Sequence, residues 1–231
     1  MAPRLIQYDD SIDFIWQEVV YTEARLIADP TAADLAPRVA SVFPKLDGVR
    51  AALLGVVRTE VVAQAQVDAA DDQLDDVVTR VGKALDRVVD GDREDPRWNR
   101  YFANTTPRKV TVQALEAEVK TVRTWSASLK TEEERALQKL SEPMAQAVAR
   151  GDEALAARTA AAGQRRDFNA RDKAKLVDQL NNLRLDVHAD LSKRVVPNKL
   201  DRAWPDGFFR KGPSRSVAPA QGATPTDPQP A

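Results

Sequence analysis

Two long stretches of the sequence place apolar residues at every third or fourth position, and each predicts a long amphipathic helix. The first lies within Lys45–Asp90, has no proline, and carries the stripe Val49, Leu53, Val56, Ala63, Val67, Ala70, Leu74, Val77, Val81, Leu85 and Val88. The second runs from about Asp152 to Val196, with the stripe Leu155, Ala162, Leu176, Leu180, Leu183, Val187, Leu191 and Val195. At a rise of 1.5 Å per residue, the first helix is expected to be about 65–70 Å long.

A more broken helical pattern precedes each long helix. Residues 12–27 predict one helix, which Asp29-Pro30 ends, and a short helix is expected to follow to about residue 43. Residues 112–129 predict another, and Thr131–Glu134 has the spacing of a capping box that restarts a helix toward residue 148. No segment alternates apolar and polar residues over more than a few positions, so the sequence predicts an all-α chain.

The sequence also repeats itself at an offset of 106 residues. Asp95–Phe102 aligns with Asp201–Phe208, and the identical pairs there and just beyond are Asp95/Asp201, Trp98/Trp204, Phe102/Phe208 and Pro107/Pro213. This indicates two halves, 3–106 and 107–212, each a broken helix followed by a long unbroken one. Two such hairpins bury their apolar stripes by packing together. The predicted fold is an elongated antiparallel four-helix bundle, built from two repeated helical hairpins as a single domain over residues 1–210.

Composition adds a tail and removes several classes of chemistry. Five of the 14 prolines lie in the last nineteen residues, so residues 211–231 are expected to form a disordered tail rich in proline and alanine. The chain has no cysteine and one histidine, which excludes disulfides, thiolate metal sites and centres that need several histidines. His188 has Leu185 three positions before it, so the Glu-x-x-His motif of di-iron bundles is missing. We predict no metal and no cofactor.

Charge and hydropathy bear on the partner and the compartment. The 34 basic and 35 acidic residues give a net charge of −1, which provides no general attraction for nucleic acid. No apolar run is long enough to span a membrane, and the first ten residues lack the apolar stretch of a signal peptide. A cytoplasmic protein is therefore expected.

Aromatic residues cluster directly after each long helix. The cluster consists of Trp98, Tyr101 and Phe102 in the first half and Trp204, Phe208 and Phe209 in the second. In the predicted bundle they lie at the same pole. They are either a surface that binds a partner or a hydrophobic cap that closes the end of the bundle, and the small alanine and valine residues of the stripes favour the cap.

Charged residues cluster in two segments of the chain, one acidic and one basic. The acidic face consists of Asp68, Asp71, Asp72, Asp75 and Asp76, and the basic face of Arg165, Arg166, Arg171, Lys173 and Lys175. Carboxylates of this kind suit a hard cation, but the loop and glycine of a calcium site are missing, so a solvated or docking face is favoured. Under the 106-residue offset Glu60 lies opposite Arg166, and both occupy stripe positions, which predicts a buried ion pair.

These features together predict a non-enzymatic protein that acts through protein–protein interaction, as a scaffold, adaptor or structural element. Its partner is expected to be another protein or a second copy of itself. One alternative is a helical protein that rearranges onto membranes, for which the alanine-rich segment 154–162 would supply a concealed surface. A second alternative is an enzyme with no recognisable motif. No acid, base and nucleophile converge in the sequence, which favours the first reading.

Overall fold

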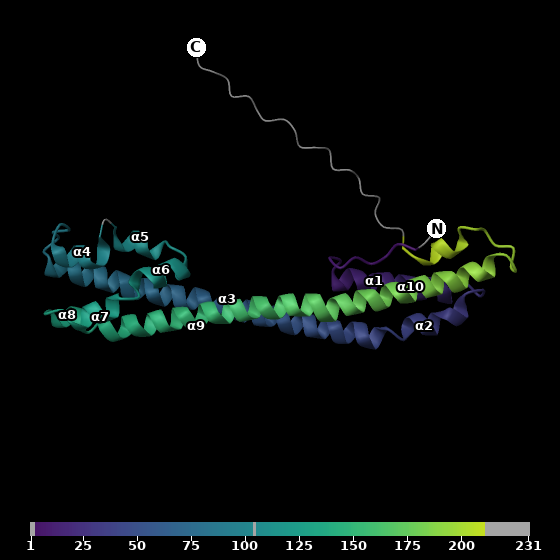
Figure 1. Cartoon of the computed structure of the whole chain (residues 1–231), viewed down its shortest axis with the longest axis horizontal. Helices are drawn as coiled ribbons and strands as arrows, with labels where there is room; N and C mark the ends of the chain where they lie inside the picture. The colour runs from purple at the N-terminus through teal and green to yellow at the C-terminus, as the bar shows by residue number, and fades with distance from the viewer. Residues whose placement is uncertain (1–2, 104, 211–231) are drawn as a thin grey trace, which may run out of the picture. The chain divides into compact units, whose positions relative to one another are not determined.

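The computed structural model describes residues 3–103 and 105–210, and over those residues every regular element is helical (Figure 1). In chain order the elements are α1 (Ile12–Ile27), the 3-10 turn η1 (Ala33–Leu35), α2 (Ala36–Ala40), α3 (Phe43–Val88), α4 (Pro96–Phe102), α5 (Pro107–Thr111), α6 (Leu115–Val122), α7 (Trp125–Lys130), α8 (Arg135–Gln138), α9 (Ser141–Phe168), the π turn η2 (Asn169–Lys173), α10 (Ala174–Val195) and the 3-10 turn η3 (Trp204–Phe208). The prediction of an all-α chain is confirmed. The tail predicted over residues 211–231 lies outside the described residues.

The residue contacts divide the chain into two compact units. Over the described residues, unit 1 consists of residues 3–48 and 174–210, and unit 2 consists of residues 49–103 and 105–173. Helix α3 begins in unit 1 and continues through unit 2. Unit 1 combines a segment of the first half of the sequence repeat with a segment of the second half, and the boundary between residues 106 and 107 falls inside unit 2. Each unit therefore contains residues of both halves.

The two predicted long helices differ in the structure. Helix α3 is continuous over 46 residues, as the apolar stripe predicts. The second stretch begins earlier than predicted, at Ser141, and η2 interrupts it between α9 and α10, so the prediction of an unbroken helix is wrong. The buried residues explain the interruption: Ala154, Ala161 and Phe168 recur every seven positions, whereas the next buried residue, Leu176, comes eight later. The wider π turn absorbs the extra residue.

The broken regions are more fragmented than the pattern predicts. Helix α1 has the predicted bounds, and the hydroxyl of its N-cap Ser11 accepts a hydrogen bond from the Phe14 amide at 3.1 Å. The predicted helix over 112–129 is divided into α6 and α7. The predicted capping box at Thr131–Glu134 is wrong: Thr131 ends α7, and its hydroxyl donates backward to the Ser128 carbonyl at 2.9 Å. The residue that precedes α8 is Glu134, and no side chain caps the start of that helix.

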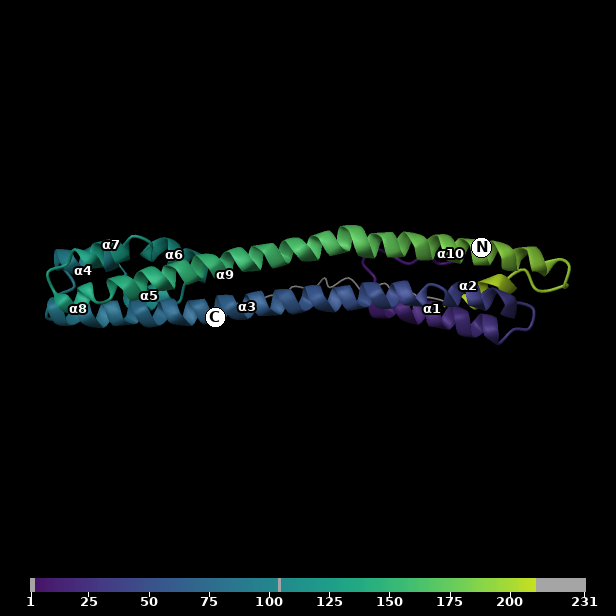
Figure 2. The same ribbon diagram turned by 90° about the horizontal axis from the view of Figure 1, so that it is seen from below.

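In unit 2, the short helices cover only one part of α3. Helices α6 and α7 pack against α9, and α9 runs beside α3 (Figure 2). The buried α3 residues of the apolar core run from Val67 to Leu85, and the rest of the core comes from Val89 and from the segment that contains α4 to α9. Residues 49–66 of α3 therefore lie outside this core cluster.

In unit 1, helices α1 and α2 pack together, and η3 packs against both α1 and α10. Fully buried side chains of this unit include Ile15, Leu26, Leu46 and Phe208. The segment before α1 is tied to α10 by Asn181, whose side chain accepts from the Ile6 amide at 2.8 Å and donates to the Ile6 carbonyl at 2.9 Å. The main-chain groups of an irregular segment are thereby satisfied by a helix side chain.

Candidate functional site

An exposed apolar stripe on α3 is the feature of unit 2 that packing within the unit does not explain. Leu54, Val57, Val61 and Val62 are 65%, 37%, 63% and 49% exposed. Positions 54, 57 and 61 are spaced by three and four, so these side chains share one helix face, and Val62 lies beside it. We call these four residues the α3 stripe.

The α3 stripe lies away from the face that builds the core. The core face of α3 includes Ala63, Val67, Ala70 and Leu74, all buried. Isolated exposed apolar residues are normal on protein surfaces, but a contiguous patch of them marks an interaction site. The stripe also falls within residues 49–66, where the core cluster has no residues.

Charged residues extend the same face of α3 at both ends. Arg50 lies one turn before Leu54, and Asp68 and Asp72 lie two and three turns after Val61. All three side chains are exposed. Arg58, which is also exposed, lies among the stripe residues, one turn after Leu54. The face therefore carries Arg50 and Arg58 in its first half and Asp68 and Asp72 at its other end.

Sequence reasoning missed the α3 stripe because it followed the longest regular apolar pattern, which is the core face. The signal was present in the same segment: between Val49 and Ala63 apolar residues occur on every side of the helix. A helix that is apolar all round is covered on more than one side. Of the predicted core stripe, Val49, Leu53 and Val56 are only half-buried.

The predicted aromatic residues belong to two separate cores. Trp98, Tyr101 and Phe102 lie in unit 2, and Trp204, Phe208 and Phe209 lie in unit 1, so they form no shared surface within either unit. All are buried except Trp204, which is half-buried. In unit 2 the Phe102 ring meets the Trp125 ring edge-on at 4.9 Å, and the Tyr101 hydroxyl donates to Glu132 at 2.8 Å. In unit 1 the Trp204 indole donates to Asp29 at 2.9 Å.

The predicted acidic face separates into exposed and inward residues. Asp68, Asp72 and Asp76 are exposed, whereas Asp71 and Asp75 are half-buried, and each has one buried carboxylate oxygen without a hydrogen-bond partner. They lie near Glu118 of α6, which is fully buried and whose two carboxylate oxygens also find no donor. We call Asp71, Asp75 and Glu118 the carboxyl cluster.

Burial and mutual repulsion raise the pKa of each carboxyl group in the cluster. Burial, followed by the charges of Asp75 and Asp71, raises the pKa of Glu118 to about 8. Burial also raises the pKa of Asp71 and of Asp75, and neighbouring aspartates add to both shifts. Among residues 3–103 and 105–210, no group of three or more His, Asp or Glu side chains is placed to hold a metal ion. The cluster is a set of carboxyl groups with a raised pKa, and Glu118 is the member that the sequence pattern did not indicate.

The predicted buried pair between Glu60 and Arg166 is not present. Glu60 instead lies 3.7 Å from Arg165, and both side chains are about one-third exposed, whereas Arg166 is exposed. The offset between the repeat halves therefore misplaces the contact by one residue. The other residues of the predicted basic face do not form one helix face: Arg171 and Lys173 lie in η2, and Lys175 lies in α10.

A buried ion pair does exist in unit 1, between Glu18 of α1 and Arg184 of α10. Their closest atoms are 3.3 Å apart, and the residues are 1% and 5% exposed. Arg184 also donates to the Arg4 carbonyl at 3.1 Å and lies 5.0 Å from the centre of the Phe209 ring. One oxygen of Glu18 remains without a partner, so the pair is only partly satisfied.

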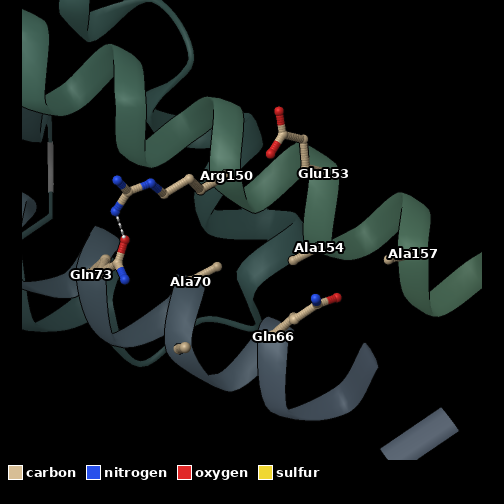
Figure 3. Close-up of a pocket in the computed structure, with 8 residues that line it drawn as sticks. Gln66, Ala70, Gln73, Arg150, Glu153, Ala154 and Ala157 are labelled. Atoms are coloured by element: carbon tan, nitrogen blue, oxygen red, sulfur yellow. Dashed lines mark hydrogen bonds between the residues drawn. The ribbon is translucent and has the colours of Figure 1, made fainter. Parts of the chain in front are cut away.

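A shallow groove of about 380 Å³ lies between α3 and α9 in unit 2 (Figure 3). Ala70 and Ala154 line it together with Gln66, Gln73, Arg150 and Glu153, and Arg150 donates a hydrogen bond to Gln73 across it. None of the lining side chains is a hydroxyl or an imidazole that could act as a nucleophile or neutral base. The groove results from small residues on two facing helices, and its charged lining residues are Arg150 and Glu153.

His188, the single histidine, lies in unit 1 with a ring nitrogen 2.9 Å from the carboxylate of Asp206. No helix over the described ranges 3–103 and 105–210 is both long and apolar enough to cross a membrane. Comparison with protein-family models, with curated proteins and with solved structures found no match to this chain.

Proposed function

We propose that this chain is a non-enzymatic, cytoplasmic helical protein that acts by binding another protein chain through the α3 stripe. The observation that carries the proposal is the exposure of Leu54 and Val61, each more than 60% accessible, on a helix face that points away from the core. Burying a valine or leucine side chain contributes about 1.5–3 kcal/mol. A partner that covers the stripe gains this energy.

The acidic and basic ends of the same face support a protein partner of defined orientation. Charges at the rim of an apolar patch contribute to the choice and alignment of a partner more than to affinity. The repeated aromatic segments also support our proposal that the fold arose by duplication of a helical hairpin. An antiparallel four-helix bundle made from two such hairpins remains part of that proposal.

The proposed function is tested by cross-linking at the stripe in living cells. A photoreactive amino acid at position 54 is expected to give covalent protein adducts, because Leu54 is 65% exposed and lies in the stripe. The same residue placed at Val112, which is 73% exposed and lies outside the stripe, is the matched control. Adducts at both positions in equal yield, or at neither, would contradict the proposal.

A further inference from the structure

We propose that Glu118 of α6 and Asp75 of α3 form a binding site for one shared proton, and that this proton stabilises the packing of α6 against α3. The inference goes beyond the proposed function and does not depend on the α3 stripe. It starts from two separate observations in unit 2: a run of aspartates on α3, and a buried carboxyl group that faces them from another helix. The ligand of the site is a hydrogen ion.

Glu118 supplies the observation that points to a ligand. Its side chain is fully buried, and neither of its carboxylate oxygens finds a hydrogen-bond partner among residues 3–103 and 105–210. One buried oxygen of Asp75 is also without a partner over the same ranges. Burying a polar group without a hydrogen bond costs free energy, and burying an unpaired carboxylate costs more. A bound proton removes the charge and supplies a donor.

A proton placed between Glu118 and Asp75 satisfies both groups. After burial and the charge of Asp75, a hydrogen bond with Asp75 raises the pKa of Glu118, whereas for Asp75 the same bond acts against burial and lowers the pKa. Opposite effects of one bond are expected for a donor and its acceptor. The protonated Glu118 carboxyl therefore donates to a carboxylate oxygen of Asp75, and hydrogen bonds to a charged acceptor are stronger than neutral ones.

The charged groups on the helices around α6 favour the protonated form of this site. They are Asp68, Asp71 and Asp72 on α3, Arg108 and Lys109 on α5, and Arg150, Asp152, Glu153 and Arg158 on α9. After burial, the charges of the α3 acids raise the pKa of Asp71 and of Asp75. The basic groups are exposed, and the charges that shift the pKa of Glu118 are those of Asp75 and Asp71. Neighbouring acids oppose ionisation, which a nearby base would favour.

The state of the site determines how firmly α6 packs. Leu115, Val119 and Val122 of α6 lie in the apolar core of unit 2, and Glu118 lies among them in sequence. Loss of the proton leaves two carboxylates buried side by side, and their repulsion and desolvation favour release of α6. Because burial and these neighbours raise the pKa of Glu118 from 4.5 to about 8 in the packed state, packing weakens by up to about tenfold for each pH unit between these values.

The first test follows the side-chain carboxyl carbons of the full chain by NMR titration. In wild type, the signals of Glu118 and Asp75 are expected to shift together in two steps, because the two groups titrate as a pair. In Asp75→Asn, Glu118 is expected to titrate in one step, with its midpoint lower by about one pH unit or more. Asp72→Asn, at an exposed position of the same helix, is the matched control and leaves both steps in place.

The second test measures release of α6 through an introduced thiol, since the chain has no cysteine of its own. Val119→Cys places the thiol in α6, where the side chain is 1% exposed, and Val187→Cys places it at a fully buried position of α10 in unit 1 as the control. After correction for the thiolate fraction, labelling at position 119 is expected to accelerate at least about tenfold from pH 6 to pH 8, and labelling at position 187 to change less than about twofold. Glu118→Gln added to Val119→Cys is expected to abolish the acceleration.

The two tests together decide the proposal. Paired titration of Glu118 and Asp75, with an acceleration at position 119 that Glu118→Gln abolishes, supports it. A wild-type Glu118 that titrates in a single step, or that responds alike to Asp75→Asn and Asp72→Asn, overturns the shared proton. Labelling at position 119 that does not accelerate, that accelerates no more than at position 187, or that still accelerates in Glu118→Gln overturns the role of the proton in holding α6.

Discussion

Glu118 is a buried carboxyl group whose charged neighbours are Asp75 and Asp71. Its ordinary pKa is 4.5, and burial together with these neighbours raises the pKa to about 8 in the folded chain. Between these values the folded state holds a proton that the unfolded state has lost. The free energy of unfolding therefore decreases as pH rises from 4.5 to 8.

Glu118→Gln removes this titration while it keeps the shape of the side chain. We expect the variant to be more stable than wild type at pH 8 by about 1–3 kcal/mol, and the difference to shrink toward pH 5, where wild-type Glu118 is protonated. Urea denaturation at the two pH values measures it. The control is Glu116→Gln on the exposed side of the same helix. A gain for Glu118→Gln that is equal at pH 5 and pH 8 would contradict the account.

Substitution at the buried pair of Glu18 and Arg184 is expected to destabilise the chain, whereas Glu118→Gln is expected to stabilise it. Removal of one member of the pair leaves the other buried without its partner. Arg184→Met is expected to cost about 3–5 kcal/mol, since it leaves the buried carboxyl group of Glu18 without its partner in unit 1. The double variant Glu18→Met/Arg184→Met is expected to be more stable than Arg184→Met alone. Thermal and urea unfolding of the wild type, Glu18→Met, Arg184→Met and the double variant gives the coupling energy, and additive effects would show that the pair is not coupled.

The contact between α6 and α9 depends on a glycine. A Cβ atom added at Gly151 would lie 2.6 Å from a methyl group of Val119, which is buried. Helix propensity alone favours Gly151→Ala by about 1 kcal/mol. We expect the clash to outweigh that gain, so that Gly151→Ala destabilises the chain by about 1–3 kcal/mol, the usual cost of overpacking.

The same helix provides the control for this prediction. Nothing lies within 4 Å of a Cβ atom added at Gly163, so Gly163→Ala is expected to stabilise the chain by up to about 1 kcal/mol. Val119→Ala should rescue Gly151→Ala, because it removes the methyl group in the way. Urea denaturation measures all four chains. If Gly151→Ala proves as stabilising as Gly163→Ala, α6 does not pack closely on α9.

The elements show where sequence patterns are informative and where they are not. The bounds of α1 and the length of α3 follow from apolar periodicity, because one face of each helix is buried over most of its length. The division between α6 and α7, and the π turn before α10, do not. Those features depend on where the neighbouring helices lie in the folded unit, and local periodicity carries no information about that.

The candidate sites show the same division. The acidic segment was predicted from the sequence, but the sequence does not show that Asp71 and Asp75 are the members that lie near buried Glu118 of α6. The ion pair between Glu18 and Arg184 is buried, and no local sequence pattern connects residues so far apart in the chain. The α3 stripe could have been found from the sequence, since its excess of apolar residues is local to the segment after Val49.

At the scale of the whole molecule, the described carboxyl groups with a raised pKa lie in unit 2, whereas carboxyl groups with a lowered pKa, such as Asp95, occur in both units. In unit 2, burial raises the pKa of Glu118, Asp71 and Asp75. In unit 1, hydrogen bonds from Arg194 and from Lys193 lower the pKa of Asp34 and of Asp190, respectively. Groups with a lowered pKa stabilise the fold above their ordinary value of 3.8 and lose that effect only in more acidic solution.

A rise from pH 5 to pH 8 should therefore loosen unit 2 and not unit 1. We expect hydrogen exchange, after correction for the intrinsic rates, to speed up in peptides of α6 and of α3 around residues 67–78, while peptides of α1 and α10 keep their protection. Hydrogen exchange through local opening reports the stability of each region separately, whereas exchange through global unfolding would change in both units alike. In Glu118→Gln the acceleration in unit 2 should be largely lost, because the proton that the folded state holds at pH 5 is no longer released. Equal acceleration in both units, or no effect of Glu118→Gln, would show that the carboxyl cluster does not control the stability of unit 2.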